Sequence, residues 1–463
     1  MKPILTLAAL LLAALPCAPL DAQAPPAVRL EYEEETLPNG LKVIYSVDRS
    51  APVASTVLWY DVGSKHEVRG RTGFAHLFEH LMLFTGSRNA PEGRHFGLLE
   101  AVGARAGSDI NGTTSFDRTN YFQQVPSHAL ELALWLEADR MATLDEALNE
   151  GKLANQREVV KNERRQGMDN QPYGRWIERI LVHMYPEEHP YRHVVLGSME
   201  DLENASIEDV RGFFRTYYVP NNAVLVVAGD IDVPQVRQMV RRYFGGIPGG
   251  AEPPPVRRVP LPPHLGASPR EVIPDANAPA PAVYVGFRMP SARDPRDNAV
   301  SLLGQMLGAR SSALYDRLVR QQQIATSVGA FNLGLVDGAD AFFIIAQGKP
   351  GANADSLEAA LMAQLSDLGP NLSDAALERA RAQQRFGFIN GLQATGGFGG
   401  RADLLAMGAT YFNDPGWVNR QLAESDQVTL AQLQALVRER LTPDNRVVLV
   451  YVPAAQPSTS GGN

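Results

Sequence analysis

The chain has 463 residues, of which 44% are hydrophobic, 20% charged and 8% aromatic. This composition is that of a globular protein and excludes disordered, collagen-like and coiled-coil chains. Lys and Arg number 43 against 51 Asp and Glu, a formal net charge of −8. Proteins that bind nucleic acid need clustered basic side chains, which this acidic chain lacks, so we expect no nucleic acid partner.

The first 24 residues have the three parts of a secretory signal peptide. Met1 and Lys2 precede an apolar run from Ile4 to Leu15, and small residues follow as far as Ala24. The run is too short to cross a bilayer, and no later segment offers the roughly 20 apolar residues that a span needs. We therefore predict that residues 1–24 are removed, that the mature protein has no membrane span, and that it is periplasmic or secreted.

Cys17 is the only cysteine of the chain. It leaves with the signal peptide unless it carries a lipid anchor, and Pro16 directly before it is unfavourable for a lipidation site. A mature chain without cysteine can form neither disulfides nor thiolate metal sites.

The segment after the signal peptide predicts strands first and helices afterwards. Strands are expected at residues 30–35, 41–47 and 53–60, with Pro38-Asn39-Gly40 as the turn of the first pair, and a strand hairpin at residues 109–125. Helical spacing or length predicts helices at residues 73–84, 129–144, 153–166 and 207–217. This mixture indicates an α+β unit with a mostly antiparallel sheet and helices packed on one face.

One of these helices carries a polar triplet in an otherwise apolar segment. Residues 73–84 have the sequence Gly-Phe-Ala-His-Leu-Phe-Glu-His-Leu-Met-Leu-Phe, in which only His76, Glu79 and His80 are polar. At i, i+3 and i+4 they share one stripe of a buried helix. Two imidazoles one turn apart suit a zinc ion, and the glutamate between them is placed to act on a metal-bound water. The alternative is a buried His-Glu-His hydrogen-bond cluster without metal.

A catalytic zinc site needs a third protein ligand, and the helix at residues 153–166 offers two carboxylates. Glu163 shares a helix face with the apolar Val159 and Val160, whereas Glu158 lies among charged neighbours. We predict that Glu163 points inward as the third ligand and that Glu158 is an ordinary surface acid.

A proline-rich segment divides the chain nearly in half. Seven prolines fall between residues 251 and 270, a density typical of an extended, semi-rigid connector. We predict a first domain at residues 28–248, a linker at 249–270, a second domain at 271–455 and a flexible tail at 456–463.

The two halves end on the same pattern. In each, a helix leads through a Pro-containing turn to Asn and an apolar strand, at a constant offset of 223 residues that relates Pro220 to Pro443 and Asn222 to Asn445. Such self-similarity is the signature of a repeated unit. We predict two homologous tandem α+β domains.

His76-Leu77-Phe78-Glu79-His80, with a carboxylate helix downstream, resembles the inverted zinc motif H-x-x-E-H of the pitrilysin and insulinase family of peptidases. The resemblance covers most of the mature chain and is to the short, two-domain bacterial type, similar to mitochondrial processing peptidase subunits. It implies paired homologous domains that form half of a clamshell chamber. It also implies one zinc ion bound by His76, His80 and Glu163, with Glu79 as the general base.

The segment 107–114 resembles the edge strand on which the family binds substrate peptides through main-chain hydrogen bonds. Asn111 and Gly112 are the substrate-binding positions that the resemblance implies. The alternative is a plain Gly-Asn-Gly hairpin. His189-Pro190-Tyr191 also resembles the family, and we assign it a structural role.

Two features depart from the family. Members often carry a second glutamate seven residues before the third ligand, where this chain has Gln156, so the charge that tunes the metal site from outside the ligand shell is missing. Active assemblies also take an Arg and a Tyr from the second half, and the matching positions here are Val319 and Thr326. A shift of one residue would let Arg320 serve, but no Tyr follows.

We therefore expect the zinc-bearing subunit of a heterodimer, with a homologous partner that supplies the Arg/Tyr pair; a homodimer is the second option. The expected activity is that of a zinc-dependent endopeptidase acting on short or unfolded peptides in a closed chamber. The main alternative is a non-catalytic assembly or peptide-binding subunit. A zinc hydrolase of other substrates is less favoured, because the edge strand suits a peptide.

Overall fold

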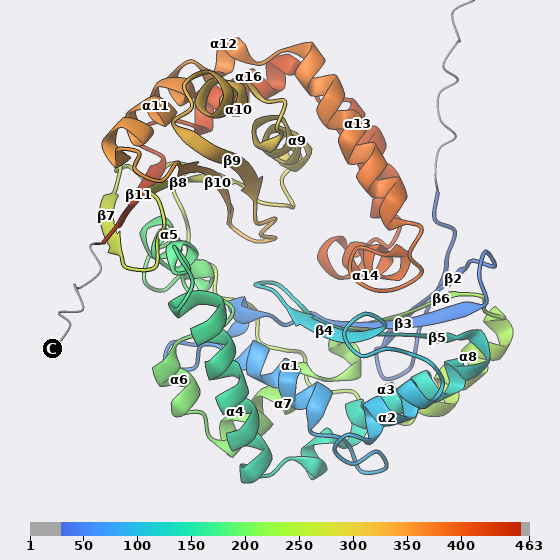
Figure 1. Ribbon diagram of the computed structural model, residues 1–463. Coiled ribbons are helices and arrows are strands. Elements are labelled where there is room, and N and C mark those ends of the chain that lie inside the picture. The colour runs from blue at the N-terminus through green and yellow to red at the C-terminus, as the bar shows by residue number, and fades with distance from the viewer. Residues whose placement is uncertain (1–28, 455–463) are drawn as a thin grey trace, which may run out of the picture.

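The computed structural model describes residues 29–454 (Figure 1). The predicted signal peptide with Cys17 and the predicted tail from residue 456 lie outside the described residues. No helix in the described range has both the length and the apolar character needed to cross a bilayer.

Two β-sheets organise the chain. The first has the order β1-β2-β6-β3-β5-β4 and the second the order β7-β11-β8-β10-β9. The strands of the first sheet are β1 (Glu33–Thr36), β2 (Lys42–Val47), β3 (Val53–Tyr60), β4 (Ile110–Thr114), β5 (Thr119–Pro126) and β6 (Ala223–Gly229). Those of the second are β7 (Arg270–Asp275), β8 (Ala282–Pro290), β9 (Ala325–Asn332), β10 (Ala339–Gly348) and β11 (Arg446–Pro453).

Both sheets are mostly antiparallel, as predicted. The only parallel pairs within the two sheets are β2 with β6 and β7 with β11. The predicted strand at residues 53–60 has those bounds in β3, and the predicted turn at residues 38–40 joins β1 to β2. Gly40 has a φ of +89°, and a Cβ there would lie 2.5 Å from that of Asn221, so this turn admits only glycine.

All but the last helix of the first half lie between its strands, and the helices of the second half lie between theirs. The first half contains α1 (Phe74–Phe84), α2 (Arg94–Ala101), α3 (Leu130–Ala147), α4 (Glu150–Arg164), α5 (Trp176–Met184), α6 (Met199–Glu203), α7 (Ile207–Tyr217) and α8 (Val233–Phe244). The second contains α9 (Asp297–Gly308), α10 (Ala313–Tyr315), α11 (Ala354–Ser366), α12 (Leu368–Asn371), α13 (Asp374–Gly391), α14 (Arg401–Phe412), α15 (Trp417–Asp426) and α16 (Leu430–Arg440).

The repeated unit is confirmed at the level of single residues. The helices α7 and α16, and the strands β6 and β11, begin at positions 223 residues apart. In both units an asparagine amide in the turn holds the end of the helix. Asn222 donates to the carbonyls of Tyr217 (2.9 Å) and Asp61 (3.2 Å), and Asn445 donates to those of Arg440 (2.7 Å) and Arg288 (2.9 Å).

The Asn445 amide is fully buried, so its loss should be costly. We expect Asn445→Ala to lower the free energy of unfolding by about 2 kcal/mol, because two buried carbonyls lose their donor. Denaturant unfolding measures this difference, with Asn390→Ala at an exposed position of α13 as the control. Equal stability of the two variants would contradict the assigned role of the turn.

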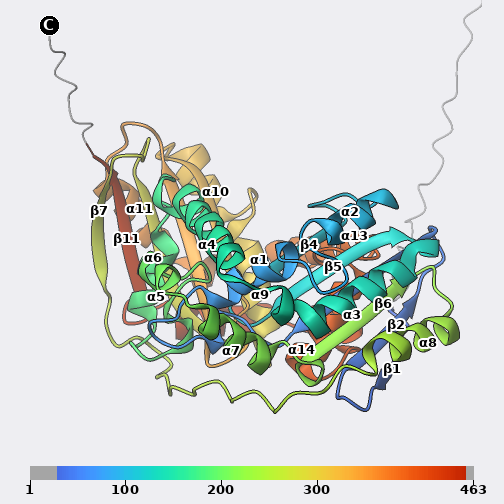
Figure 2. The same cartoon turned by 90° about the horizontal axis from the view of Figure 1, so that it is seen from below.

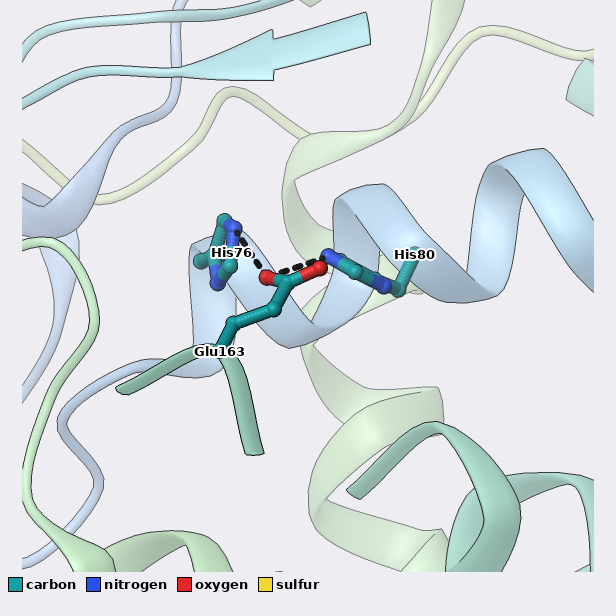
Figure 3. Close-up of side chains that lie close together, drawn as sticks. All are labelled: His76, His80 and Glu163. Carbon is teal, nitrogen blue, oxygen red and sulfur yellow. Dashed lines mark ion pairs between the residues drawn. The ribbon is translucent and has the colours of Figure 1, made fainter. Parts of the chain in front are cut away.

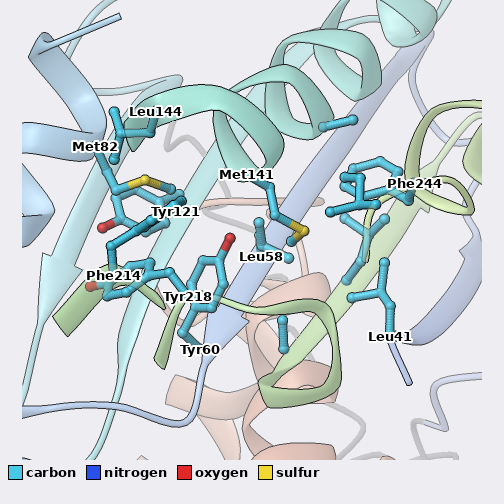
Figure 4. Close-up of a cluster of buried hydrophobic side chains, with 14 of the residues drawn as sticks. Leu41, Leu58, Tyr60, Met82, Tyr121, Met141, Leu144, Phe214, Tyr218 and Phe244 are labelled. Carbon is cyan, nitrogen blue, oxygen red and sulfur yellow. The ribbon is translucent and has the colours of Figure 1, made fainter. Parts of the chain in front are cut away.

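The main core of the first half lies between the first sheet and its helices (Figure 4). Its side chains are large and tightly buried, and they belong to strands and helices distant in sequence. The residues labelled in Figure 4 are Leu41, Leu58, Tyr60, Met82, Tyr121, Met141, Leu144, Phe214, Tyr218 and Phe244. This core holds the back of α1 against the sheet.

Each sheet is also covered on a further face by a helix from the other half (Figure 1). Helix α5 of the first half packs on β8 and β11, where Trp176 stacks on Tyr284 with ring centroids 5.0 Å apart. Helix α14 of the second half packs on β3 and β6, where Tyr411 meets Trp59 at 5.4 Å. This exchange was not predicted from the sequence, and it makes the two halves one structure.

The halves are further joined by an ion pair of the buried Lys65 and by the proline-rich segment. Lys65 is 5% exposed, and its Nζ lies 3.0 Å from Asp117 of the first half and 2.9 Å from Asp337 of the second. Between Gly250 and Arg270 the chain forms no helix or strand, and Figure 2 shows it as an extended yellow-green trace along the lower edge of the view.

Candidate metal centre

The first residue of helix α1 is fixed by its backbone conformation and its hydrogen bonds. Its N-cap, Gly73, has a φ of +86°, and a Cβ there would lie 2.8 Å from the carbonyl oxygen of Leu196. The carboxylate of Glu67 accepts hydrogen bonds from the backbone N–H groups of Gly73 (2.8 Å) and Ala75 (2.7 Å), and the His193 ring lies 2.9 Å from the same carboxylate. A negative charge at a helix N-terminus is favourable, and here it orients the first turn of α1.

The predicted burial of α1 is confirmed. Nine of its eleven residues are buried, including Glu79 and His80, while His76 is partly buried. The helix therefore presents its polar stripe from a rigid, packed element.

His76, His80 and Glu163 come together, as Figure 3 shows. The Glu163 Oε2 atom lies 3.3 Å from His80 Nε2 and 3.7 Å from His76 Nε2. The possible ligand atoms all lie within 4.8 Å of one another. Among the described residues this is the only group of three His, Cys, Asp or Glu side chains that meets the geometry of a metal site.

Helix α4 turns Glu163, and not Glu158, towards α1. Val160, on the buried face of α4, is fully buried. Glu158 is exposed, and its Oε1 lies 2.8 Å from Lys161 Nζ. The expectation that Val159 shares the buried face is wrong, because Val159 is 37% exposed. The Glu163 side chain itself is 45% exposed, so the site is open to solvent on the α4 side.

Directly after Arg164, the chain continues as the π-helical segment η3 (Arg165–Asp169), a kind of irregularity common near functional sites.

The spacing of the three side chains is wider than that of a hydrogen-bonded cluster and leaves room for a cation between them. Well-formed N–H···O hydrogen bonds are about 2.9–3.0 Å long, and both His–Glu distances exceed this. Ligands at about 2.0–2.1 Å from a tetrahedral zinc ion are separated by roughly 3.3–3.4 Å. Two imidazoles and one carboxylate are also the ligand types that zinc accepts with a position left open.

Two of the three side chains have the protonation state that a metal ligand needs, whereas a metal at His80 has to displace a proton. Burial, together with the neighbouring His80, lowers the pKa of His76 to about 4, so this ring is neutral near pH 7 and has a free lone pair. Burial also acts to lower the pKa of His80, but the Glu163 carboxylate outweighs it and raises that pKa. The same contact with His80 lowers the pKa of Glu163, which is therefore ionised.

Glu79 lies on the same helix face but is not part of the three-residue cluster. It is 7% exposed, and its Oε2 accepts a hydrogen bond of 2.7 Å from the Thr114 hydroxyl. Burial is the main cause that raises the pKa of Glu79. Gln156, two helical turns before Glu163, is also buried, and its Oε1 has no hydrogen-bond partner among the described residues.

Asn111 and Gly112 lie inside β4, at the free edge of the first sheet, and they pair with Phe122 and Tyr121 of β5. They lie in the first strand of the β4–β5 hairpin, a position that both the substrate-binding interpretation and the plain hairpin allow. The Asn111 amide bonds to the Gly107 carbonyl (3.0 Å), and its Oδ1 accepts from the Gly112 N–H (2.8 Å). A Cβ at Gly112 would lie 3.0 Å from the Tyr121 ring, so a small residue lets β4 pack closely.

The positions of the missing Arg and Tyr lie in the second half. Val319 belongs to the π-helical segment η6 (Asp316–Gln321), and Thr326 is exposed on β9. Arg320 stays with its neighbours, 3.6 Å from Asp316 and over the Tyr315 ring at 5.5 Å. No histidine follows His264, so the second half has no zinc motif of its own.

Sequence comparison agrees with this geometry. The family described as insulinase (peptidase family M16) matches residues 42–194, and the domain described as the peptidase M16 inactive domain matches residues 204–384. The chain belongs to peptidase family M16. The inactive-domain match covers residues that follow the zinc motif in the chain.

Relatives in the family include named proteases. The zinc protease PqqE of Helicobacter pylori is 29% identical over 385 residues, which cover 81% of this chain and 84% of that protein. A probable mitochondrial-processing peptidase subunit beta of Arabidopsis thaliana is 27% identical over 380 residues, 79% of this chain and 68% of that protein.

Solved structures share the fold. The crystal structure of a protease from Helicobacter pylori superposes with a TM-score of 0.83 at 26% identity, over 92% of this chain and all of that one. The first half of the periplasmic protease PqqL from Escherichia coli gives a TM-score of 0.72 at 18% identity, over 92% and 93% of the two chains. The predicted α+β fold with two tandem homologous domains is confirmed.

Proposed function

We propose that this chain is a zinc-dependent endopeptidase. The convergence of His76, His80 and Glu163, with the buried Glu79 on the same helix face, is the observation that carries this proposal. When bound, zinc would polarise the scissile carbonyl and lower the pKa of water. A structural role alone would not require a carboxylate held beside the ligands, so the catalytic interpretation is favoured over a non-catalytic assembly subunit.

In this proposal the ligands are His76, His80 and Glu163, and Glu79 accepts the proton of the attacking water and passes it to the leaving amine. The substrate peptide pairs with the free edge of β4, along Asn111 and Gly112. Main-chain pairing is tolerant of side chains, which suits short or unfolded peptides. Gln156 keeps a hydrogen-bonding group near His80 without adding charge.

We further propose that the chain works with a partner. Val319 and Thr326 occupy the positions where active assemblies have Arg and Tyr, so a homologous subunit would supply that pair in a heterodimer. One relative is named as a peptidase subunit, which supports this arrangement. A homodimer is the second option. From the signal-like residues 1–24 we propose that the protein acts in the periplasm or after secretion.

An assay of the purified full-length chain on a quenched fluorescent peptide tests the proposal. We expect hydrolysis that a chelator abolishes and added zinc restores, and that rises several-fold when proteins co-purified from the native source are added. Hydrolysis that survives chelation would contradict the zinc peptidase. Equal rates with and without the added proteins would contradict the partner.

A further inference from the structure

Thr114 provides the hydrogen bond that orients Glu79. Its hydroxyl oxygen lies 2.7 Å from Glu79 Oε2. Within the part of the chain that the structure describes, no other group hydrogen-bonds to this carboxylate. Glu79 is buried, so a lost donor cannot be replaced freely by water. The Thr114 side chain therefore determines which way the carboxylate faces.

The next residue back along the strand faces the other side of the sheet. Side chains alternate along a strand, so Thr113 points away from α1 when Thr114 points towards it. The Thr113 hydroxyl contacts the Asn120 side-chain carbonyl at 2.6 Å, and Arg118 donates to the Thr113 carbonyl at 2.7 Å. Strand β4 is thus held by polar contacts on the face opposite Glu79.

The second half of the chain holds these contacts in place. Asp403 on α14 accepts hydrogen bonds from the Asn120 amide (2.9 Å) and from the Trp59 indole (2.7 Å). The Gly399 N–H, at 2.9 Å, donates to the other oxygen of the same carboxylate. A charged acceptor makes such bonds shorter and stronger than neutral ones. A polar path therefore runs from α14 through Asn120 and β4 to the carboxylate of Glu79.

We infer that Thr114 is a positioning residue for Glu79, and that Asp403 positions the strand that carries Thr114. The second half then takes part in the active site of its own chain, although it contains no zinc motif. This inference rests on the proposed peptidase function. The inference depends on the adjacent residues Thr113 and Thr114 of β4. Thr113 contacts Asn120 on one face of the sheet, and Thr114 contacts Glu79 on the other. Catalytic groups must be held to within about 0.5 Å, so small shifts of this strand should reduce turnover.

Thr114→Val removes the hydroxyl and keeps the branched shape. We expect kcat to fall about tenfold or more, since a misplaced catalytic group can cost up to about 100-fold. KM should stay within twofold of wild type, and zinc content should be unchanged. Thr114→Ser keeps the donor and should retain at least half of the wild-type kcat. A rescue by serine is not expected from a residue that acts by packing alone.

Wild-type kcat in folded, zinc-loaded Thr114→Val would overturn the inference, as would a serine variant no better than the valine variant. Should Thr114→Val fail to fold, Thr114→Ala provides the same test with less steric demand, and a wild-type kcat in that variant has the same meaning. Absence of chelator-sensitive hydrolysis in the wild-type chain would instead contradict the proposed function itself.

Asp403→Ala tests the second part. We expect a lower kcat/KM with zinc content unchanged, and a raised KM, because β4 also pairs with the substrate in the proposed function. Asp355→Ala, at a side chain that is 85% exposed in the same half, is the matched control and should behave as wild type. The double variant Thr114→Val/Asp403→Ala should lose less than the product of the single losses. Fully multiplicative losses would overturn the path from Asp403 to Glu79.

Discussion

Glu79→Gln is expected to abolish peptide hydrolysis while the protein keeps its zinc. The amide has the shape of the carboxylate and can still accept the Thr114 hydrogen bond of 2.7 Å. It cannot accept a proton, however, and loss of a general base typically costs about 10²- to 10⁴-fold in rate. The measurement is kcat on a quenched peptide, together with zinc per chain by elemental analysis.

Glu158→Gln is the matched control for this variant, because it makes the same chemical change at an exposed residue paired only with Lys161. It should hydrolyse the peptide at the wild-type rate. If Glu79→Gln also turned over at that rate, the peptidase interpretation would fail, and the chain would be a peptide-binding or assembly subunit of its family.

Glu163→Gln is expected to lose zinc. The carboxylate comes from a different helix than the two histidines and lies 3.3 and 3.7 Å from their Nε2 atoms, so its removal leaves only ligands from a single helical turn. The loss of affinity should exceed the roughly 10- to 100-fold cost of changing a residue outside the ligand shell. Dialysis against a competing chelator, followed by metal analysis, measures it.

Glu158→Gln again provides the comparison, now on the same helix, α4, and it should bind zinc as the wild type does. Circular dichroism of both variants separates loss of metal from loss of fold. Wild-type zinc affinity in Glu163→Gln would mean that the three side chains form a hydrogen-bonded cluster, with any metal bound elsewhere.

Local patterns predicted the elements well where one face of an element is buried. Strand β3 and helix α7 have their predicted bounds, and helix α1 starts one residue later than predicted. Their hydrophobic spacing follows directly from the pitch of a helix or strand. The repeated turn at Asn222 and Asn445 was also visible, since each turn's chemistry is encoded within a few residues.

The candidate metal centre was predictable for a related reason. His76 and His80 are placed by helical geometry alone, and Glu163 was chosen over Glu158 by helical phase. Helical phase did not predict the exposure of Val159. At the border of a buried helix face, the elements packed against the helix decide whether a side chain is exposed.

Contacts between distant segments were not predictable in this way. Thr114 is 35 residues from Glu79, and Asn120 is 283 residues from Asp403. Neither contact is reflected in a periodic pattern of the sequence. The same holds for α5 and α14, each of which covers the sheet of the opposite half; the proline-rich connector predicted two domains but not this exchange.

The amino-acid order by itself therefore determined the two repeated α+β units, the buried helix with its His-Glu-His stripe and the choice of Glu163 over Glu158, because each follows from spacing or turn chemistry that can be read along the chain. Only the tertiary structure decided that Thr114 orients Glu79, that Asp403 steadies the edge strand, and that the halves exchange helices. These features depend on which surfaces pack together when the two sheets and their helices bury a shared apolar core. The residues brought into contact in this way are far apart in the chain, and no sequence periodicity relates them.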